Sequence, residues 1–360
     1  MSDISAIDSN FKVETNIKQD DLRFYDPKQA PFQIYGVYYE DGKFRRLPEE
    51  VAKTVNSGVL RLHANTAGGR VRFQTDSPYV AIHTKMSGIG KMSHFPLTGS
   101  AGFDLYAKAE DEPERYRGTF TPPFAIVDGY ESVLHFESAK MREITVNMPL
   151  YSEVTELYIG LQEDAVVLPP RPYKIETPIV YYGSSITQGG CASRPGNAYQ
   201  SAISRRLDAD YVNLGFSGSA RGEVEIAEYV AGLSMSAFVY DYDHNAPTPE
   251  HLQNTHERMF LAVREAHPDI PIVLMSRPRA YLNQEDQQRL AIITATYENA
   301  KNRGDQNVYL LTGPELMADA GYDGNVDGTH PTDLGFASMA RALGDLLERI
   351  VKDPLSKGDS

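Results

Sequence analysis

A proline cluster, Pro169-Pro170-Arg171-Pro172, divides this sequence into two halves with different hydrophobic patterns. Proline lacks a backbone N–H and fixes φ, so such a cluster cannot continue a helix or a central strand. It predicts a domain boundary, with one domain over residues 1–170 and a second over residues 171–360. The length of 360 residues supports this division, because single hydrophobic cores rarely grow so large.

The first half consists of short apolar runs broken by turn signals. The runs at 58–63, 71–75 and 80–84 are separated by Ala67-Gly68-Gly69 and by Ser77-Pro78. Further runs occur at 125–127, 133–136, 144–146 and 154–159. Many short strands without a long helix predict an antiparallel, jelly-roll-like β-sandwich.

The second half alternates apolar strands with amphipathic helices. The expected strands are 179–182, 210–214, 237–240, 272–275 and 308–311, and the expected helices lie near 198–207, 223–231, 249–266, 285–301 and 334–351. Continuous apolar strands in this alternation predict a parallel sheet covered on both faces. Ligands of such sheets bind beyond the carboxyl ends of the strands.

Charge and cysteine content exclude several classes of protein. A formal charge of −14 and a pI near 5.1 argue against a nucleic-acid partner or an anionic membrane, which would require clustered Lys and Arg. No run approaches the roughly 20 apolar residues of a membrane span, and the first residues lack the features of a secretory signal. We therefore expect a soluble, cytoplasmic protein. The single cysteine, Cys191, excludes an intramolecular disulfide framework and a Cys-rich zinc site.

Three polar segments follow the first three strands of the second half. Ser185, in Gly183-Ser184-Ser185-Ile186-Thr187, should stand at the carboxyl edge of the sheet. Gly218 could bring its backbone N–H to a reacting oxygen without interference from a Cβ, and Asn245 could donate a side-chain N–H to the same oxygen. Each segment is also compatible with ordinary turn chemistry.

The segment Asp327-Gly328-Thr329-His330 offers the partners that a serine nucleophile requires. A histidine must take the serine proton, and a carboxylate must hold that histidine in the right tautomer. The D-x-x-H spacing puts Asp327 close enough to orient His330. No second histidine lies at helical ligand spacing, so metal catalysis is the weaker interpretation. We expect no cofactor and no metal.

In this order, the four segments resemble those of the SGNH (GDSL-type) hydrolase superfamily, over roughly residues 176 to 352. The resemblance implies a three-layer, flavodoxin-like α/β domain with Ser185 as nucleophile and His330 as base, oriented by Asp327. It also implies an oxyanion hole made by the Ser185 backbone N–H, Gly218 and Asn245. The motif around Ser185 differs from the G-x-S-x-G elbow of α/β-hydrolases.

Two positions depart from the family pattern. Ser184 stands where the family usually has Asp, at a position that supports the loop more than the chemistry. Ala246 replaces the Asp that usually follows the oxyanion Asn245, and the same loop carries His244, a candidate substrate contact.

The first half contains Gly102-Phe103-Asp104-Leu105-Tyr106, similar to the G-x-D-L-Y signature of a β domain attached to one branch of these hydrolases. We expect Asp104 and Tyr106 to pin a strand end of the sandwich. A β domain followed by an SGNH domain also resembles the architecture of some carbohydrate esterases.

The sequence as a whole predicts a serine esterase that removes small acyl groups, acetyl above all, from a carbohydrate or other polyol. Its expected partner is a small-molecule or oligosaccharide ester, with no nucleic acid and no membrane. The candidate pocket residues near strand ends are Tyr199, Arg221, Arg277 and Arg279, which equally suit a surface or core-edge position.

Two alternatives stay open at this point. One is a lactonase or lipid-type acyl hydrolase with the same triad, and the other is a non-catalytic carbohydrate-binding protein. The sequence also leaves open whether the chain forms a homo-oligomer and whether the β domain contributes side chains to the site.

Overall fold

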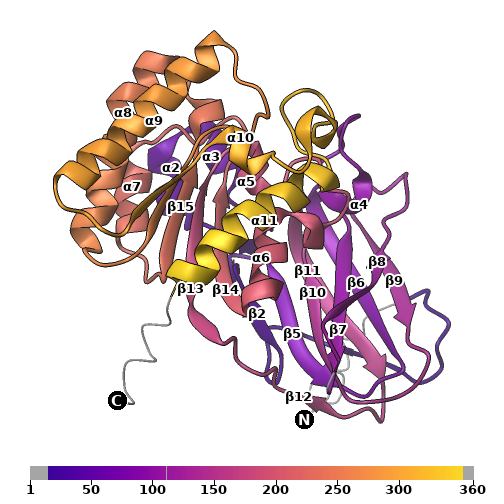
Figure 1. Ribbon diagram of the computed structural model, residues 1–360. Helices are drawn as coiled ribbons and strands as arrows, with labels where there is room; N and C mark the ends of the chain where they lie inside the picture. Colours follow the sequence, from indigo (N-terminus) through magenta and orange to yellow (C-terminus); the bar gives the residue numbers. More distant parts are fainter. Residues whose placement is uncertain (1–14, 111, 352–360) are drawn as a thin grey trace, which may run out of the picture.

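The computed structural model describes residues 15–110 and 112–351 and has two bodies packed side by side (Figure 1). The first is built from antiparallel strands. These are β1 (Leu22–Tyr25), β2 (Gln33–Tyr35), β5 (Arg70–Thr75), β6 (Tyr79–Gly88), β7 (Phe103–Ala109), β8 (Arg115–Phe120), β9 (Gly129–His135), β10 (Arg142–Asn147), β11 (Glu153–Gln162) and β12 (Val167–Leu168). One sheet has the order β1-β11-β6-β9, and the other has the order β12-β5-β10-β7-β8 with β2 also on β5.

The two antiparallel sheets enclose one apolar core, as the alternating pattern predicts. Phe73, Leu105 and Ile144 of one sheet and Ile82 and Leu157 of the other are fully buried in it. Side chains alternate between the faces of a strand, so the inner positions of each strand fill this core. The β-sandwich expected for the first half is therefore confirmed. This half also contains a separate hairpin, formed by β3 (Tyr38–Glu40) and β4 (Lys43–Arg45), and the short helix α4 (Leu97–Ser100).

Two of the expected strands in this half are wrong. Residues 125–127 form a turn, in which the Ile126 N–H donates to the carbonyl of Pro123 at 2.9 Å and Val127 is 80% exposed. The run at 58–63 is helical and belongs to α3 (Ser57–Leu62). The side chain of Asn56 caps this helix by accepting the N–H groups of Gly58 and Val59, both at 2.9 Å.

The helix α3 and its neighbour α2 (Glu49–Val55) belong to the first half by sequence but pack against the second. Val59 and Leu62, spaced three apart, lie on one helix face and join the same core cluster as Phe216 and Ile226. Figure 1 shows α2 and α3 among the helices beside the parallel sheet. The helical spacing serves this contact, whereas a strand would send neighbouring side chains to opposite faces.

The second body contains the predicted parallel sheet. Its strands are β13 (Ile175–Gly183), β14 (Ala209–Gly215), β15 (Ala237–Asp241), β16 (Ile272–Met275) and β17 (Val308–Leu311), in the order β14-β13-β15-β16-β17. All pairs in it are parallel, and each expected strand is present. The proline cluster lies in the connection between β12 and β13.

Helices cover both faces of the parallel sheet. They are α6 (Tyr199–Leu207), α7 (Val224–Ala231), α8 (Pro249–Ala266), α9 (Gln284–Asn302) and α11 (Asp333–Ile350), close to the predicted bounds. Tyr181 and Val239 pack under α6 and α11, whereas the alternate residues Tyr182 and Tyr240 pack under α7 and α8. The three-layer α/β architecture expected for the second half is therefore confirmed.

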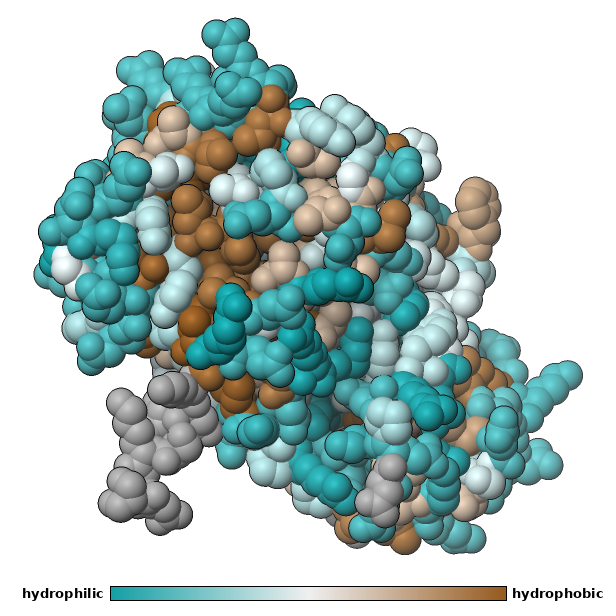
Figure 2. All heavy atoms as spheres, viewed as in Figure 1, coloured by the Kyte–Doolittle hydropathy of each residue, from teal (hydrophilic) through white to brown (hydrophobic). Residues whose placement is uncertain are grey.

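The outer surface is mostly hydrophilic in the view of Figure 2, with apolar side chains gathered in a band between α9 and α11. The edge strand β17 has only one fully buried residue, Val308. Within residues 15–110 and 112–351, no helix has both the length and the apolar character that crossing a bilayer requires.

The signature 102–106 joins the two bodies. Asp104 is fully buried, and its Oδ2 accepts the Arg194 Nη1–H at 2.9 Å and the Gly196 backbone N–H at 2.8 Å. Its Oδ1 accepts the Asn147 Nδ2–H at 2.7 Å. Tyr106 Oη accepts a second contact from Arg194 at 2.6 Å. The expectation that Asp104 and Tyr106 only pin a strand end of the sandwich is thus wrong, because their main partners belong to the second body.

We predict that Asp104→Asn destabilises the protein strongly. An amide N–H would then face the donors of Arg194 or Gly196, and breaking a buried ion pair from one side typically costs about 3–5 kcal/mol. The chain has no tryptophan, so the free energy of unfolding is best followed by circular dichroism in urea.

The control variant is Glu156→Gln, which removes one partner of the exposed Lys85–Glu156 pair. Its free energy of unfolding should stay near that of the unmodified protein, because exposed ion pairs contribute little. Equal stability of the Asp104 variant and this control would contradict an anchoring role for Asp104.

Candidate active site

Ser185 is the first residue of the short helix α5 (Ser185–Gln188), directly after β13. Ser184 caps this helix by accepting the Ile186 N–H at 3.2 Å. The end of β14 approaches α5 so closely that a Cβ on Gly215 would lie 2.1 Å from the Gln188 nitrogen. These contacts fix Ser185 at the carboxyl edge of the parallel sheet, where the sequence predicts it.

The structure brings Asp327, His330 and Ser185 into one line of hydrogen bonds. His330 Nε2 lies 2.9 Å from Ser185 Oγ, and His330 Nδ1 lies 2.7 Å from Asp327 Oδ2. The other carboxylate oxygen of Asp327 accepts the backbone N–H groups of Thr329 at 3.0 Å and of His330 at 2.8 Å. With Nδ1 donating to the carboxylate, Nε2 is free to accept the serine proton.

Asp327 is held in its ionised form. Burial alone would raise its pKa, but the hydrogen bonds from the His330 backbone and side chain and from the Thr329 backbone lower the pKa to about 2. The carboxylate therefore stays negative throughout the neutral range and can accept the His330 Nδ1–H.

The three candidate oxyanion donors, two backbone N–H groups and one side-chain amide, each keep a hydrogen that no described residue accepts. Gly218 has φ +66°, a conformation that favours glycine, and its missing Cβ faces open space. Among the described residues, the N–H groups of Ser185 and Gly218 have no hydrogen-bond acceptor. Asn245 Nδ2 donates one hydrogen to the Phe216 carbonyl at 3.0 Å, which leaves its second N–H available.

His244 is the neighbour of Asn245 in the single-turn helix η2 (Asp243–Asn245). Burial and then the positive charges of Arg277 and Arg279 lower the pKa of His244 well below its usual range, and His330 adds to this effect. His244 is therefore neutral. In the described part of the chain, neither His244 Nε2 nor Arg279 Nε has a hydrogen-bond partner, although both are buried. Both candidate contacts therefore keep one unpaired buried nitrogen.

The other candidate pocket residues are used differently. Arg277 donates to Asp243 at 2.8 Å and to Asp286 at 3.0 Å, so its guanidinium holds η2 in place. Tyr199 is only 1% exposed and packs against Tyr181 and Phe336, which makes it a core residue and corrects the expectation that it lines a pocket. Arg221 is exposed and donates to the Gly218 carbonyl at 3.3 Å.

Residues of the first half also reach the site, which the sequence left open. Tyr151 Oη donates to the Ser185 carbonyl at 3.0 Å, and the ring of His94 lies 5.6 Å from the ring of His330. The buried Arg46 donates to the Gly215 carbonyl at 2.7 Å, just before the Gly218 turn. Burial lowers the pKa of Arg46 to about 9, so it still carries its charge at neutral pH. None of the three lies in a motif that sequence analysis could connect with Ser185.

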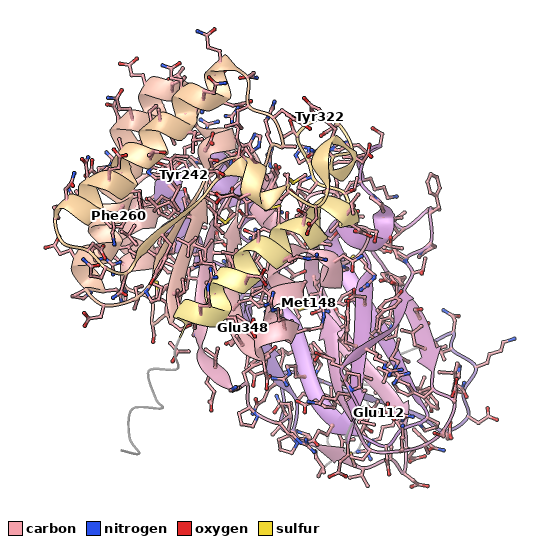
Figure 3. All side chains as sticks on the ribbon, in the orientation of Figure 1. Glu112, Met148, Tyr242, Phe260, Tyr322 and Glu348 are labelled. Carbon is pink, nitrogen blue, oxygen red and sulfur yellow. The ribbon has the colours of Figure 1, made fainter. Side chains whose placement is uncertain are left out.

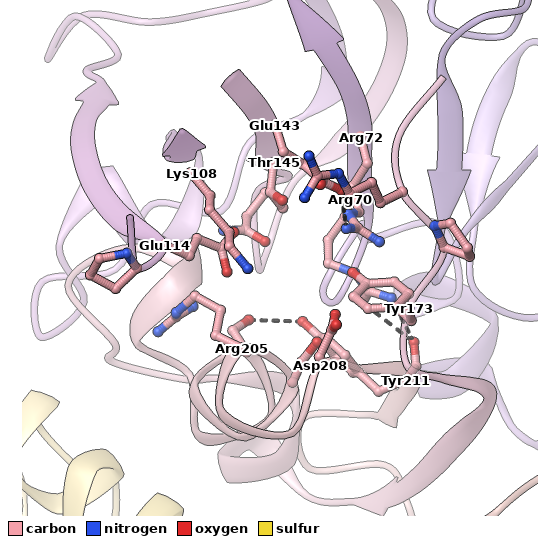
Figure 4. Close-up of a pocket in the computed structure, with 16 residues that line it drawn as sticks. Arg70, Arg72, Lys108, Glu114, Glu143, Thr145, Tyr173, Arg205, Asp208 and Tyr211 are labelled. Carbon is pink, nitrogen blue, oxygen red and sulfur yellow. Dashed lines mark hydrogen bonds and ion pairs between the residues drawn. The ribbon is translucent and has the colours of Figure 1, made fainter. Parts of the chain in front are cut away.

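A cavity of about 310 Å³ lies away from Ser185, between α6 and the sandwich (Figure 4). Lys108, Glu114 and Arg205 face Arg70 and Arg72 across it. Arg70 forms an ion pair with Asp210, and Arg72 forms one with Glu143, so the positive charge of both arginines in this cavity is already neutralised. No histidine is among the described residues that line it, so it holds no serine–histidine pair like that of Ser185 and His330.

Comparison with known families matches both halves of the chain. Residues 176–351 match the GDSL-like Lipase/Acylhydrolase family, and residues 22–167 match GxDLY, the N-terminus of Esterase_SGNH_hydro-type. None of the curated proteins matches the chain.

Several solved structures are similar over nearly their whole length. A protein of Bacteroides ovatus ATCC 8483, provisionally assigned as a GDSL-like lipase, is 28% identical, with a TM-score of 0.81 over 92% of this chain and 99% of that one. The salicylyl-acyltransferase SsfX3 of a tetracycline biosynthetic pathway is 19% identical, with a TM-score of 0.74 over 93% and 100%. A family two carbohydrate esterase of Cellvibrio japonicus is 13% identical, with a TM-score of 0.61 over 91% and 98%. The last two show a shared fold.

A buried carboxyl group, that of Asp241, contacts Ser184, the residue before the proposed nucleophile. Asp241, at the end of β15, accepts the Ser184 hydroxyl at 3.3 Å with Oδ1, and its carbonyl accepts the Ser184 N–H at 3.2 Å. Burial, followed by the charge of Asp243, raises the pKa of Asp241 to about 8. The folded protein therefore binds a proton here that the unfolded chain, with an ordinary pKa of about 3.9, releases.

We predict that Asp241→Asn makes the stability less dependent on pH. Between about pH 4 and pH 8 the unfolded chain binds fewer protons at this position than the folded protein does, so stability falls as pH rises. Asparagine does not titrate, so the melting temperature of the variant, compared with that of the unmodified protein at the same pH, should rise from pH 5 to pH 8. A difference in melting temperature that stays constant over this range would contradict a neutral Asp241.

Proposed function

Since this chain belongs to the GDSL-like lipase/acylhydrolase family, we propose that it is a serine esterase that removes small acyl groups, acetyl above all, from a carbohydrate or other polyol. The observation that carries this proposal is the line of hydrogen bonds from Asp327 through His330 to Ser185. A binding protein would not need a serine hydroxyl at 2.9 Å from an imidazole that a carboxylate orients.

The proposed reaction has two stages. Ser185 Oγ attacks the ester carbonyl while His330 Nε2 takes its proton, and the Asp327 carboxylate stabilises the resulting imidazolium. His330 then gives the proton to the departing alcohol, which leaves an acyl group on Ser185. A water molecule, deprotonated by His330, attacks this acyl group and releases the acid.

The negative charge of each tetrahedral intermediate requires donors that are free in the resting protein. The unpaired N–H groups of Ser185 and Gly218 and the second N–H of Asn245 meet this requirement. Asn245 is held by its bond to the Phe216 carbonyl, so its orientation does not depend on the substrate. His244 and Arg279, with free polar atoms, would contact the alcohol part of the ester.

An exposed aromatic pair supports a sugar-like substrate. Tyr281, in the loop after β16, and Tyr322, in η3 (Gly321–Gly324) just before Asp327, stack with ring centroids 4.6 Å apart. They are 65% and 72% exposed, and Figure 3 places Tyr322 at the outer surface beside α10 (Gly313–Leu316). Rings that are left this open to solvent offer apolar faces on which a sugar ring can stack. The shared fold with a carbohydrate esterase agrees with this substrate class.

The proposed nucleophile, Ser185, can be tested directly. Ser185→Ala should lower kcat on p-nitrophenyl acetate by at least about 10⁴-fold, because the nucleophile is lost while the binding contacts stay. Assays with acetate, butyrate and octanoate esters beside acetylated oligosaccharides and lactones define the acyl and alcohol preference.

The matched control is Ser87→Ala, which changes an exposed serine on β6 of the sandwich and should leave the rate unchanged. Retention of the full rate in the Ser185 variant would refute the proposed nucleophile. Faster cleavage of octanoate than of acetate, or of lactones than of esters, would favour the lipase or lactonase alternative. Ligand binding without any turnover would favour a carbohydrate-binding protein.

The exposed aromatic pair leads to a prediction about the alcohol part of the substrate. Tyr322→Ala should raise KM for an acetylated oligosaccharide about tenfold, which corresponds to roughly 1.4 kcal/mol of lost stacking. KM for p-nitrophenyl acetate should not change, because this small ester does not extend to the pair. Tyr116→Ala, which changes another exposed tyrosine, on β8 of the sandwich, serves as control. An equal effect of the Tyr322 change on both substrates would contradict a sugar-stacking role.

A further inference from the structure

Three side chains that can bind a metal ion gather beside the proposed triad. One ring nitrogen each of His94 and His330 and the Sγ of Cys191 lie within 4.8 Å of one another. The three residues come from separate segments: the loop after β6, the turn after α5, and the loop before α11. The grouping exists only because the sandwich and the parallel sheet pack together.

The donor set has a definite chemical preference. Imidazole nitrogen and thiolate sulfur are ligands for Zn²⁺, which binds them at about 2.0–2.3 Å in tetrahedral geometry. Such ligand atoms lie about 3.3–3.8 Å apart around the ion, so the site must contract by about 1 Å on binding. His94 can make this movement, because it is exposed and has no hydrogen bond to any described residue.

The surroundings of the cluster also suit a cation. Asp327 already accepts from His330 Nδ1, and a carboxylate in this position commonly orients a histidine that binds a metal with its other nitrogen. Burial, followed by the negative charge of Asp327, raises the pKa of the Cys191 thiol, so the bound ion itself must displace the thiol proton. A water molecule would complete the four ligands.

We propose that His94, Cys191 and His330 form an inhibitory Zn²⁺ site that switches the esterase off. The ion binds to the two imidazoles and the sulfur, and the thiol proton of Cys191 passes to solvent, with no change in oxidation state. If His330 coordinates the ion through Nε2, it loses its hydrogen bond with Ser185. If it coordinates through Nδ1, it loses its hydrogen bond with Asp327. Either way, His330 can no longer act as base.

The inhibitory effect rests on the proposed esterase function, but binding of the ion does not. Binding is therefore measured separately, with Co²⁺ as a spectroscopic substitute for Zn²⁺ on the full chain. A Co²⁺–thiolate charge-transfer band should appear on titration, and Zn²⁺ should abolish it. In parallel, Zn²⁺ should inhibit hydrolysis of p-nitrophenyl acetate, and EDTA should restore the rate.

Two variants test the ligands and a third serves as control, each compared with its own rate without metal. Cys191→Ser should remove the charge-transfer band and raise the Zn²⁺ inhibition constant at least tenfold, the lower limit seen even for loss of an outer-shell partner. His94→Ala should raise the inhibition constant similarly. His135→Ala, which changes a histidine at the end of β9, should alter neither readout.

The outcomes separate the two proposals. A band that depends on Cys191 in a protein without esterase activity would support the metal site and refute the proposed function. Esterase activity with no band and no inhibition by Zn²⁺ would overturn the metal site alone. Inhibition that persists unchanged in the Cys191 and His94 variants would also overturn it, because the ion would then bind elsewhere.

Discussion

The buried carboxylate of Asp104 is the contact on which the geometry of the site depends. It fixes Arg194 and Gly196, and the adjacent Ser193 N–H donates at 2.8 Å to Asp333, the first residue of α11. Asp333 in turn follows closely after His330 in the chain. A single line of polar contacts thus runs from the sandwich to the loop that carries the proposed base, and the sandwich is part of the site's framework.

Charged groups on the opposite side of the site hold the proposed oxyanion donor in a similar way. Arg277 and Arg289 both bind Asp243, and Arg277 also binds Asp286. These groups are all nearly or fully buried, where ion pairs define geometry more than they add stability. These ion pairs fix η2 and therefore also Asn245 and His244, which belong to it. Arg277, just after the end of β16, thus positions η2, whereas Arg279 keeps an unpaired Nε–H.

Sequence analysis succeeded where the signal is local. The strands of the parallel sheet are continuous apolar runs, and the side chains of Ser185, Asp327 and His330, which lie in short motifs at strand and loop ends, are within hydrogen-bond distance of one another in series. It failed at residues 58–63, where an apolar–polar alternation concealed a helix capped by Asn56 and buried against another domain. It also missed Arg46, His94 and Tyr151, because these residues reach the site through packing between the two halves, and such contacts produce no recognisable pattern in the sequence. The position of Tyr199 near a strand end could not reveal which way its ring points.

The placement of α2 and α3 has a consequence for synthesis on the ribosome. Residues 49–62 leave the ribosome with the sandwich, but their apolar partners in α7 and around Phe216 are translated only after the entire first half. Until then Val59 and Leu62 have no core to enter. After synthesis of the first half, the apolar side chains of α2 and α3 therefore stay without their packing partners until the second half has been made. The two halves complete their folding together, although they are synthesised one after the other.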